Sequence, residues 1–313
     1  MGLRYLLVQF FACNVVEKLT NMKKHMVLMT SVLMLMVLLA GCYQPIKNYK
    51  QDIHKIAIPN SLEEMEVLSS ECTQRLNDII LDSSSQQFSD FNEKLEFLGY
   101  HDLETSINNL KDLLQKTLLS CEELKITDQY IAIHQMLLDI LSKYKEEIYY
   151  LDEVAKANKD ILKMHYDVQS FNDQILEVTL SGKPTSIEYK TALEDFVKAN
   201  HDLLKLFDNE YAKAVLSGAS LDEKSMIVSI KEARDLIEDL RLIQTFNHTD
   251  GIIHNLLIQM YERILDMYDY TLNHKEIIEW SNQYKSFSDY AEVQKQSITR
   301  DMKEWEKAID ILE

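Results

Sequence analysis

Glycine and proline are scarce in this chain, with six glycines and three prolines among 313 residues. These residue types interrupt helices more strongly than any others, so long stretches without them can stay helical. Leu, Ile, Lys, Glu and Asp are abundant, and a hydrophobic content of 46% is too high for a disordered acidic chain. The composition therefore predicts an all-α protein.

The longest uninterrupted apolar pattern covers residues 133–178. Its members recur at steps of three and four, close to the seven-residue repeat of a left-handed coiled coil. They are Ile133, Leu137, Ile140, Tyr144, Ile148, Leu151, Val154, Ala157, Ile161, Met164, Val168, Phe171, Ile175 and Val178. A helix of about 50 residues would be roughly 75 Å long. Short loops between long helices favour antiparallel neighbours, so we expect an elongated antiparallel helical bundle with long coiled-coil-like hairpins.

Three capping boxes mark expected helix starts, because in each a Ser or Thr precedes a Glu by three positions. They are Ser61-x-x-Glu64, Thr185-x-x-Glu188 and Ser220-x-x-Glu223. Four glycines are expected at helix ends, namely Gly99, Gly182, Gly218 and Gly251. The predicted helices cover residues 62–81, 86–98, 102–119, 128–180, 187–216, 221–246 and 252–272, followed by a last helix that ends near residue 312.

The N-terminal part has the organisation of a secretion signal. Lys23 and Lys24 form a positive head, and the uncharged run Met26–Leu39 follows. This run is shorter than the roughly 20 residues that a spanning helix needs. An ordinary transmembrane anchor remains the alternative. Residues 1–21 lie in front of the signal, and we interpret them as an over-called start, with translation beginning at Met22; the alternative is a long N-terminal region of the signal.

The signal closes with Leu39-Ala40-Gly41-Cys42. This ending resembles the lipobox of bacterial lipoproteins. The resemblance implies a diacylglyceryl group on the sulfur of Cys42 and cleavage between Gly41 and Cys42. On this interpretation residues 22–41 are the signal peptide, residues 42–60 a polar tether and residues 61–313 a helical domain. We expect the chain to be held by its lipid on the extracytoplasmic face of the cell membrane.

The charge balance excludes several classes of partner. The chain carries a formal net charge of −18. Residues 1–41 contain four basic residues and one acidic residue, so the remainder has 29 Lys and Arg against 50 Asp and Glu, a net charge of −21. Such a chain repels nucleic acid and anionic lipid surfaces. Contact with the membrane is therefore expected through the lipid on Cys42, and the partner is expected to be a protein at the cell surface.

Two cysteines lie in the predicted body, Cys72 and Cys121. An exported pair can form a disulfide. Both also fall near apolar helix positions, where a buried free thiol is common. The sequence leaves both possibilities open.

The tetrapeptide Glu147-Ile148-Tyr149-Tyr150 resembles the motif of the EMYY-motif lipoproteins of Gram-positive bacteria, with Ile148 in place of Met. The shared plan of lipobox, acidic helical body and similar length supports the resemblance. It implies a surface lipoprotein without a known activity and supplies no functional residues. The alternative is structural: Ile148 belongs to the apolar pattern of residues 133–178, which we call the apolar seam, and the two tyrosine rings pack beside it while their hydroxyls stay solvated.

Catalytic patterns are absent from the sequence. It contains no His-Glu-x-x-His, Cys-x-x-Cys, Gly-x-Ser-x-Gly or glycine-rich phosphate loop. His248, His254 and His274 lie near one turn but lack the i, i+4 spacing of a metal pair on a helix. We therefore expect no enzyme activity, no cofactor and no metal site, and a protein of binding or scaffolding type. A solute-binding lipoprotein of a transport system is the alternative.

Overall fold

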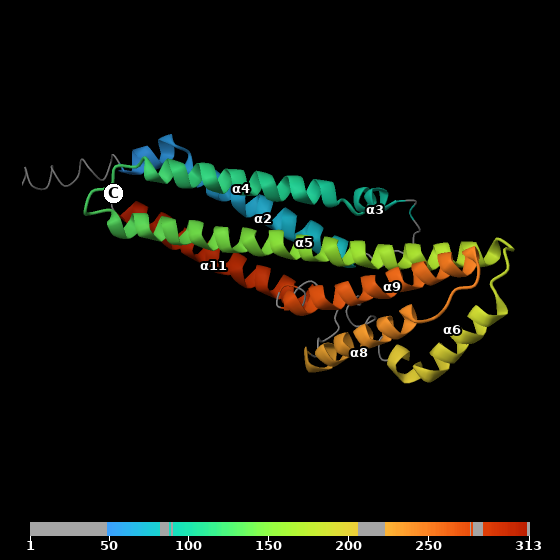
Figure 1. Ribbon diagram of the computed structural model, residues 1–313. Coiled ribbons are helices and arrows are strands. Elements are labelled where there is room, and N and C mark those ends of the chain that lie inside the picture. Colours follow the sequence, from blue (N-terminus) through green and yellow to red (C-terminus); the bar gives the residue numbers. More distant parts are fainter. Residues whose placement is uncertain are drawn as a thin grey trace, which may run out of the picture.

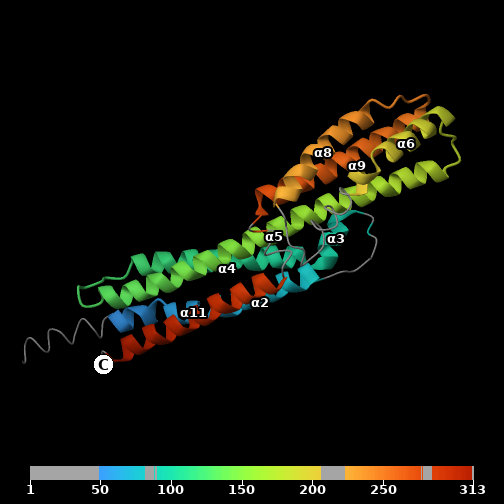
Figure 2. The same cartoon turned by 90° about the horizontal axis from the view of Figure 1, so that it is seen from below.

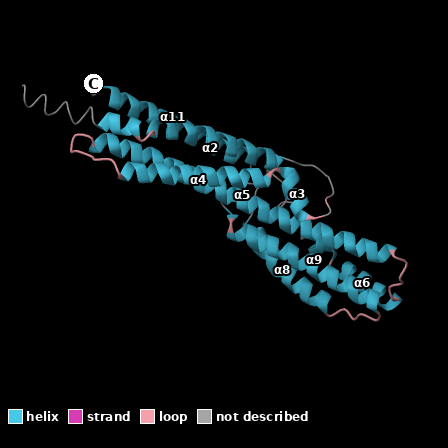
Figure 3. Ribbon diagram, turned by 90° about the horizontal axis from the view of Figure 1, so that it is seen from above, coloured by secondary structure: helices cyan, strands magenta, loops and turns pink. Residues whose placement is uncertain are grey.

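The computed structural model describes residues 49–81, 88, 90–205, 223–275, 277 and 284–311. This part of the chain consists of helices and loops and contains no strand (Figure 3). The helices are α2 (Ile58–Leu81), α3 (Phe91–Leu98), α4 (Tyr100–Glu122), α5 (Ile131–Leu180), α6 (Ile187–Ala199), α8 (Glu223–Arg241), α9 (His248–Asn273) and α11 (Tyr284–Ile311). The prediction of an all-α helical bundle is confirmed.

Helix α5 is the longest helix and runs through both parts of the molecule, and the other helices pack along its two halves (Figures 1 and 2). Its first half lies in a bundle with α2, α4 and α11, whose shared core includes Leu76, Leu110 and Trp305. Two ion pairs join α4 to α5: Lys111 pairs with Asp152 at 2.8 Å, and Glu104 pairs with Lys159. The earlier residue of α4 pairs with the later residue of α5, so the two helices are antiparallel.

The second half of α5 packs against α9, which in turn packs against α8. Asp167 of α5 meets Arg263 of α9 at 2.8 Å, and further back along α5 Asp160 accepts a hydrogen bond from the Tyr270 hydroxyl at 2.8 Å. These contacts make α9 antiparallel to α5. Helix α6 lies beside this half of the molecule (Figure 1). Helices α4 and α5 are long antiparallel neighbours joined by the short loop 123–130, as predicted, while the coiled-coil supercoil expected from the repeat stays a prediction.

The apolar seam of α5 is buried along most of its length. Every seam residue from Ile133 to Ile161 is buried, and beyond Ile161 only Val168 is. The last three turns are half-buried or exposed. The core thus thins toward the C-terminal end of α5, which we call the distal end, where the loops 181–186 and 242–247 lie. The opposite, proximal end holds Tyr49 and the loop 123–130.

The tether predicted for residues 42–60 is wrong from residue 49 onward. Residues 49–55 are helical, and α2 already begins at Ile58 instead of Leu62. Tyr49 and Ile53 are both buried, and the Tyr49 ring stacks on Tyr130 with centroids 4.9 Å apart. Polar residues between these apolar ones made the segment resemble a linker. Residues 42–48 lie outside the described residues.

Several other predicted boundaries differ from those observed, among them the end of α8, which lies at Arg241 instead of Phe246. Helix α9 begins at His248, because the Asn247 side chain accepts from the Asp250 N–H while Asp250 caps the Asn247 N–H. Gly251 therefore lies inside the first turn instead of before the helix. Helix α6 ends at Ala199, followed by a turn at Asn200 and a helical stretch over 201–205, instead of running unbroken. Gly99 and Gly182 do end helices, with φ near +77° and +75°. Gly218 and the Ser220 box lie outside the described residues.

Candidate functional site

Large apolar side chains are exposed at the distal end of the molecule. Leu180 closes α5 and is 74% exposed, and Ile187 opens α6 and is 79% exposed. Phe246 precedes α9 and is 50% exposed. Leu176, one turn before Leu180, and Leu242, which follows α8, are exposed as well. We call these five residues the distal apolar surface. Exposed apolar side chains also occur elsewhere, for example Leu119, Ile126 and Ile131 at the proximal end. A contiguous group of such residues is typical of sites that bind proteins.

One carboxylate joins the start of α6, which carries Ile187, to the loop that carries Phe246. Asp250 is fully buried and accepts hydrogen bonds from the Ser186 N–H at 2.9 Å and the Ser186 hydroxyl at 2.5 Å. The Phe246 and Asn247 N–H groups donate to the same carboxylate at 3.1 and 3.2 Å. Burial alone would raise the pKa of Asp250, but these hydrogen bonds outweigh burial and lower it. Asp250 therefore fixes the start of α6 relative to the start of α9.

Two buried aromatic side chains from α6 and α9 contact each other near this carboxylate. Tyr189 of α6 and His254 of α9 are both buried and meet edge to face, with centroids 5.9 Å apart. Burial, assisted by the charge of Asp250, raises the pKa of Tyr189 to about 12, and burial lowers the pKa of His254. Both side chains are therefore neutral at physiological pH. Tyr189 is the buried residue of α6, so this ring and the Ser186 contacts position the helix.

The tetrapeptide 147–150 lies on α5 at the junction with α2 and α11. Glu147 is buried and accepts a hydrogen bond from the Ser69 hydroxyl at 2.6 Å. Ile148 is a core residue, as the structural interpretation predicted. Tyr149 is 56% exposed and contacts Tyr150, whose ring meets Tyr290 of α11 edge to face at 5.3 Å. The tyrosines thus pack at the surface between helices.

The charged form of the buried Glu147 carboxyl is destabilised by its removal from water. Burial raises its pKa, while the Ser69 hydrogen bond and the charge of Lys295 act in the opposite direction. A raised pKa means that folding favours the protonated form. This residue is a position where pH affects the stability of the α2–α5–α11 junction.

The three histidines considered as metal ligands do not form a cluster. His248 is exposed and His254 is buried against Tyr189, while His274 stacks on Tyr270 with centroids 4.2 Å apart. Among the described residues, no group of three or more His, Cys, Asp or Glu side chains could hold a metal ion. The expectation of no metal site and no cofactor stays a prediction.

Cys72 and Cys121 are free and fully buried, and burial raises the pKa of each thiol to about 11. Of the two possibilities that the sequence left open, the structure has the buried free thiols.

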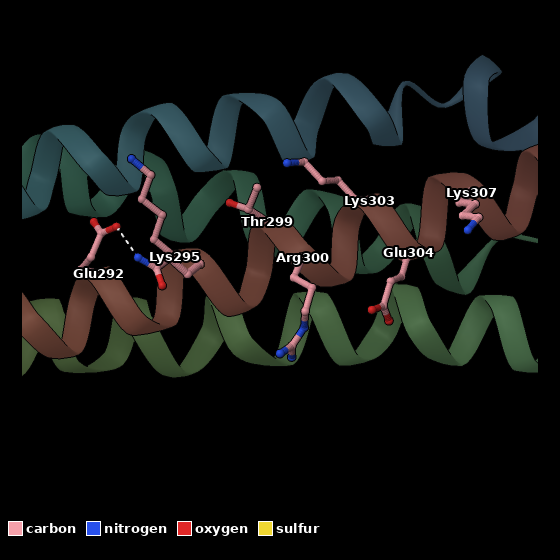
Figure 4. Close-up of a pocket in the computed structure, with 8 residues that line it drawn as sticks. Glu292, Lys295, Thr299, Arg300, Lys303, Glu304 and Lys307 are labelled. Carbon is pink, nitrogen blue, oxygen red and sulfur yellow. Dashed lines mark hydrogen bonds between the residues drawn. The ribbon is translucent and has the colours of Figure 1, made fainter.

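A groove of about 500 Å³ runs along the outer face of α11 (Figure 4). Its charged residues are Glu292, Lys295, Arg300, Lys303, Glu304 and Lys307, with Gln296 and Thr299 between them. All eight belong to one helix, so the groove is an open surface.

The lipobox residues Leu39, Ala40, Gly41 and Cys42 lie outside the described residues. Within the described ranges, no helix combines the length and the apolar character required to cross a membrane. Comparison of the chain with family models, with curated proteins and with solved structures gave no match.

Sequence reasoning missed Asp250 and Ser186. The pattern Asn247-x-x-Asp250 was the available signal, because Asn and Asp can form the same reciprocal cap as Ser and Glu. The predicted box Thr185-x-x-Glu188 was one position early, since Ser186 is the residue whose hydroxyl accepts from the Tyr189 N–H. The exposed apolar residues were not predicted as a group, because they come from three separate segments.

Proposed function

We propose that this chain is a lipid-anchored cell-surface protein that binds a protein partner through the distal apolar surface and has no catalytic activity. The observation that carries the proposal is the placement of that surface at one end of α5, while the described chain begins at the other end. At 1.5 Å per residue, the 50 residues of α5 separate the two ends by roughly 75 Å.

The anchoring part of the proposal rests on the lipobox and on the position of Tyr49. Seven positions separate Cys42 from Tyr49, a reach of at most about 25 Å for an extended chain. Tyr49 is held at the proximal end by stacking on Tyr130 and by a 3.2 Å hydrogen bond between its hydroxyl and Nδ1 of His134. A lipid on Cys42 would therefore hold the proximal end close to the membrane and leave the distal end free for binding.

The resemblance to the EMYY-motif lipoproteins supports an extracytoplasmic location in a Gram-positive cell. The solute-binding alternative would require a site that encloses its ligand. The groove on α11 is open and lined by a single helix, which favours binding of a protein over binding of a solute.

Cross-linking in intact cells followed by purification of the lipidated protein tests the proposal. A specific surface partner should be captured by the wild type and lost when Leu180→Asp and Ile187→Asp are combined. Both side chains are exposed, so these changes should leave the thermal unfolding midpoint unaltered.

Ile131→Asp provides the matched control. Ile131 is 56% exposed and lies at the proximal end of the same helix. This variant should capture the partner at the wild-type level. Equal capture by the distal double variant would exclude the distal apolar surface as the binding site, and loss of capture with Ile131→Asp alone would place the site at the proximal end.

A further inference from the structure

The charges on the outer face of α11 are arranged as a palindrome. A point between Thr299 and Arg300 divides the groove-lining residues into two matched sets. Counting outward from it in both directions, Gln296 corresponds to Lys303 in the opposite set. Continuing outward, Lys295 corresponds to Glu304, and Glu292 corresponds to Lys307. Each acidic residue of the face therefore has a basic counterpart at the equivalent position on the other side.

A two-fold axis converts such a palindrome into an interface. Residues at equal distances on either side of the axis face each other in the two copies, so the same surface patch serves both. With the axis between Thr299 and Arg300, Glu292 of each copy meets Lys307 of the other, and Lys295 meets Glu304. Among the eight groove residues no equivalent pair brings two like charges together, whereas one turn further out Asp289 corresponds to Asp310. We propose that two copies of this chain associate through the outer faces of their α11 helices.

The side chains that would form this interface are exposed, and most of them make no ion pair with the described residues of their own chain. Glu292, Lys295, Glu304 and Lys307 are all exposed. Lys303 and Lys307 make no ion pair with any of the described residues. The Glu292 carboxylate accepts a hydrogen bond at 2.9 Å from the Gln296 side chain, drawn in Figure 4, and this neutral contact leaves its charge uncompensated. The long aliphatic stems of the lysines can cover apolar surface while their ammonium groups pair.

The direction of the side chains defines how the two helices would meet. Lys295 extends toward α2, whereas its counterpart Glu304 extends toward α5 (Figure 4). Because these two matched residues lie on opposite flanks of α11, the helices must cross at an angle for the pair to meet. The two molecules then point in roughly opposite directions. Both anchors can reach one membrane when the two-fold axis is perpendicular to it.

The association is expected to be weak in dilute solution, because exposed ion pairs each contribute little. Confinement of both copies to one membrane would raise their effective concentration and favour the dimer. The interface is independent of the distal apolar surface, so the proposed function and this association can fail separately.

Zero-length cross-linking with a carbodiimide tests the pairing in membranes from cells that express the full-length protein. The reagent joins a lysine amine to a carboxylate in direct contact. Glu292 and Lys307 are 15 positions apart on one helix, about 22 Å, so a bond between them must join two chains. We expect a dimer that contains this cross-link and the Lys295–Glu304 cross-link. A product that is entirely monomeric, or dimers joined only through other positions, would refute the proposal.

Charge reversal provides the decisive variants. Glu292→Lys alone places two lysines opposite each other, and Lys307→Glu alone places two glutamates opposite each other. Each variant should lose about tenfold in dimer joined through Lys295 and Glu304, the pair that keeps both reacting groups, because two attractive contacts become repulsive in each case. When the two variants are co-expressed with different tags, all four contacts are attractive again, so mixed dimers should form at the wild-type level.

Glu188→Lys is the matched control for Glu292→Lys, since it makes the same change in net charge on an exposed position of α6. It should dimerise like the wild type. Thermal unfolding of every variant establishes that α11 is still folded. Unchanged dimer in the single variants, or mixed dimers no more abundant than those of either variant alone, would show that the palindrome does not form the interface.

Discussion

The Ser186 hydroxyl donates a 2.5 Å hydrogen bond to the carboxylate of Asp250, which lies 64 positions later in the chain. The two residues belong to different caps, Ser186 to the N-terminus of α6 and Asp250 to the first turn of α9. A carboxylate near helix N-termini is also favoured by the helix dipoles. One buried side chain thus sets the geometry of the distal end.

Asp250→Asn should lower the free energy of unfolding by about 2 kcal/mol at pH 7, because hydrogen bonds to a buried charged group are lost. The pKa of Asp250 is lowered in the folded protein, so its contribution is present above the unfolded value near 4 and is lost as the pH falls through the folded value. Urea unfolding at pH 7 and pH 3 should show a difference from the wild type that shrinks at pH 3.

Asp173→Asn is the control for this measurement, because Asp173 is exposed on α5 and makes no hydrogen bond or ion pair with the described residues. Its unfolding free energy should match the wild type at both pH values. A difference for Asp250→Asn that is equally large at pH 3 and pH 7 would contradict the role of the charged carboxylate.

Glu147→Gln should have the opposite pH dependence. The pKa of Glu147 is raised by burial, so the stability linked to its protonation is present below the unfolded value and is lost as the pH rises through the folded value. The glutamine keeps an oxygen that accepts from Ser69 without carrying a charge. The variant should therefore gain stability relative to the wild type between pH 4 and pH 7. A variant that is less stable by the same amount at both pH values would show that the carboxylate is favourably paired.

The long helices could be predicted, whereas the contacts between distant segments could not. The seam of α5 follows from spacing alone, because a run without glycine or proline has one way to bury residues at steps of three and four. Tyr49 was missed because its burial depends on Tyr130, 81 positions later, which no local pattern reveals. Asp250 was missed for the same reason, since two of its four donors come from Ser186 in another segment.

Cys72 and Cys121 should resist thiol reagents in the native protein. Both are fully buried and burial raises the pKa of each to about 11, so the reactive thiolate is scarce at pH 8 and the sulfur is inaccessible. Labelling with a maleimide, followed by mass spectrometry, should modify them only after denaturation, without prior reduction. Rapid labelling of the native protein would contradict their burial, and a requirement for reduction would indicate a disulfide.

Cys42 is the proposed lipid anchor of the chain, and metabolic labelling with a fatty-acid analogue tests this anchor most directly. Wild-type protein should be labelled and cleaved between Gly41 and Cys42. Cys13→Ala is the matched control, because this cysteine precedes the signal, and it should behave like the wild type. Cys42→Ala should carry no label and remain an uncleaved precursor. Label on Cys42→Ala at the wild-type level would contradict the lipobox and, with it, the anchored orientation of the bundle.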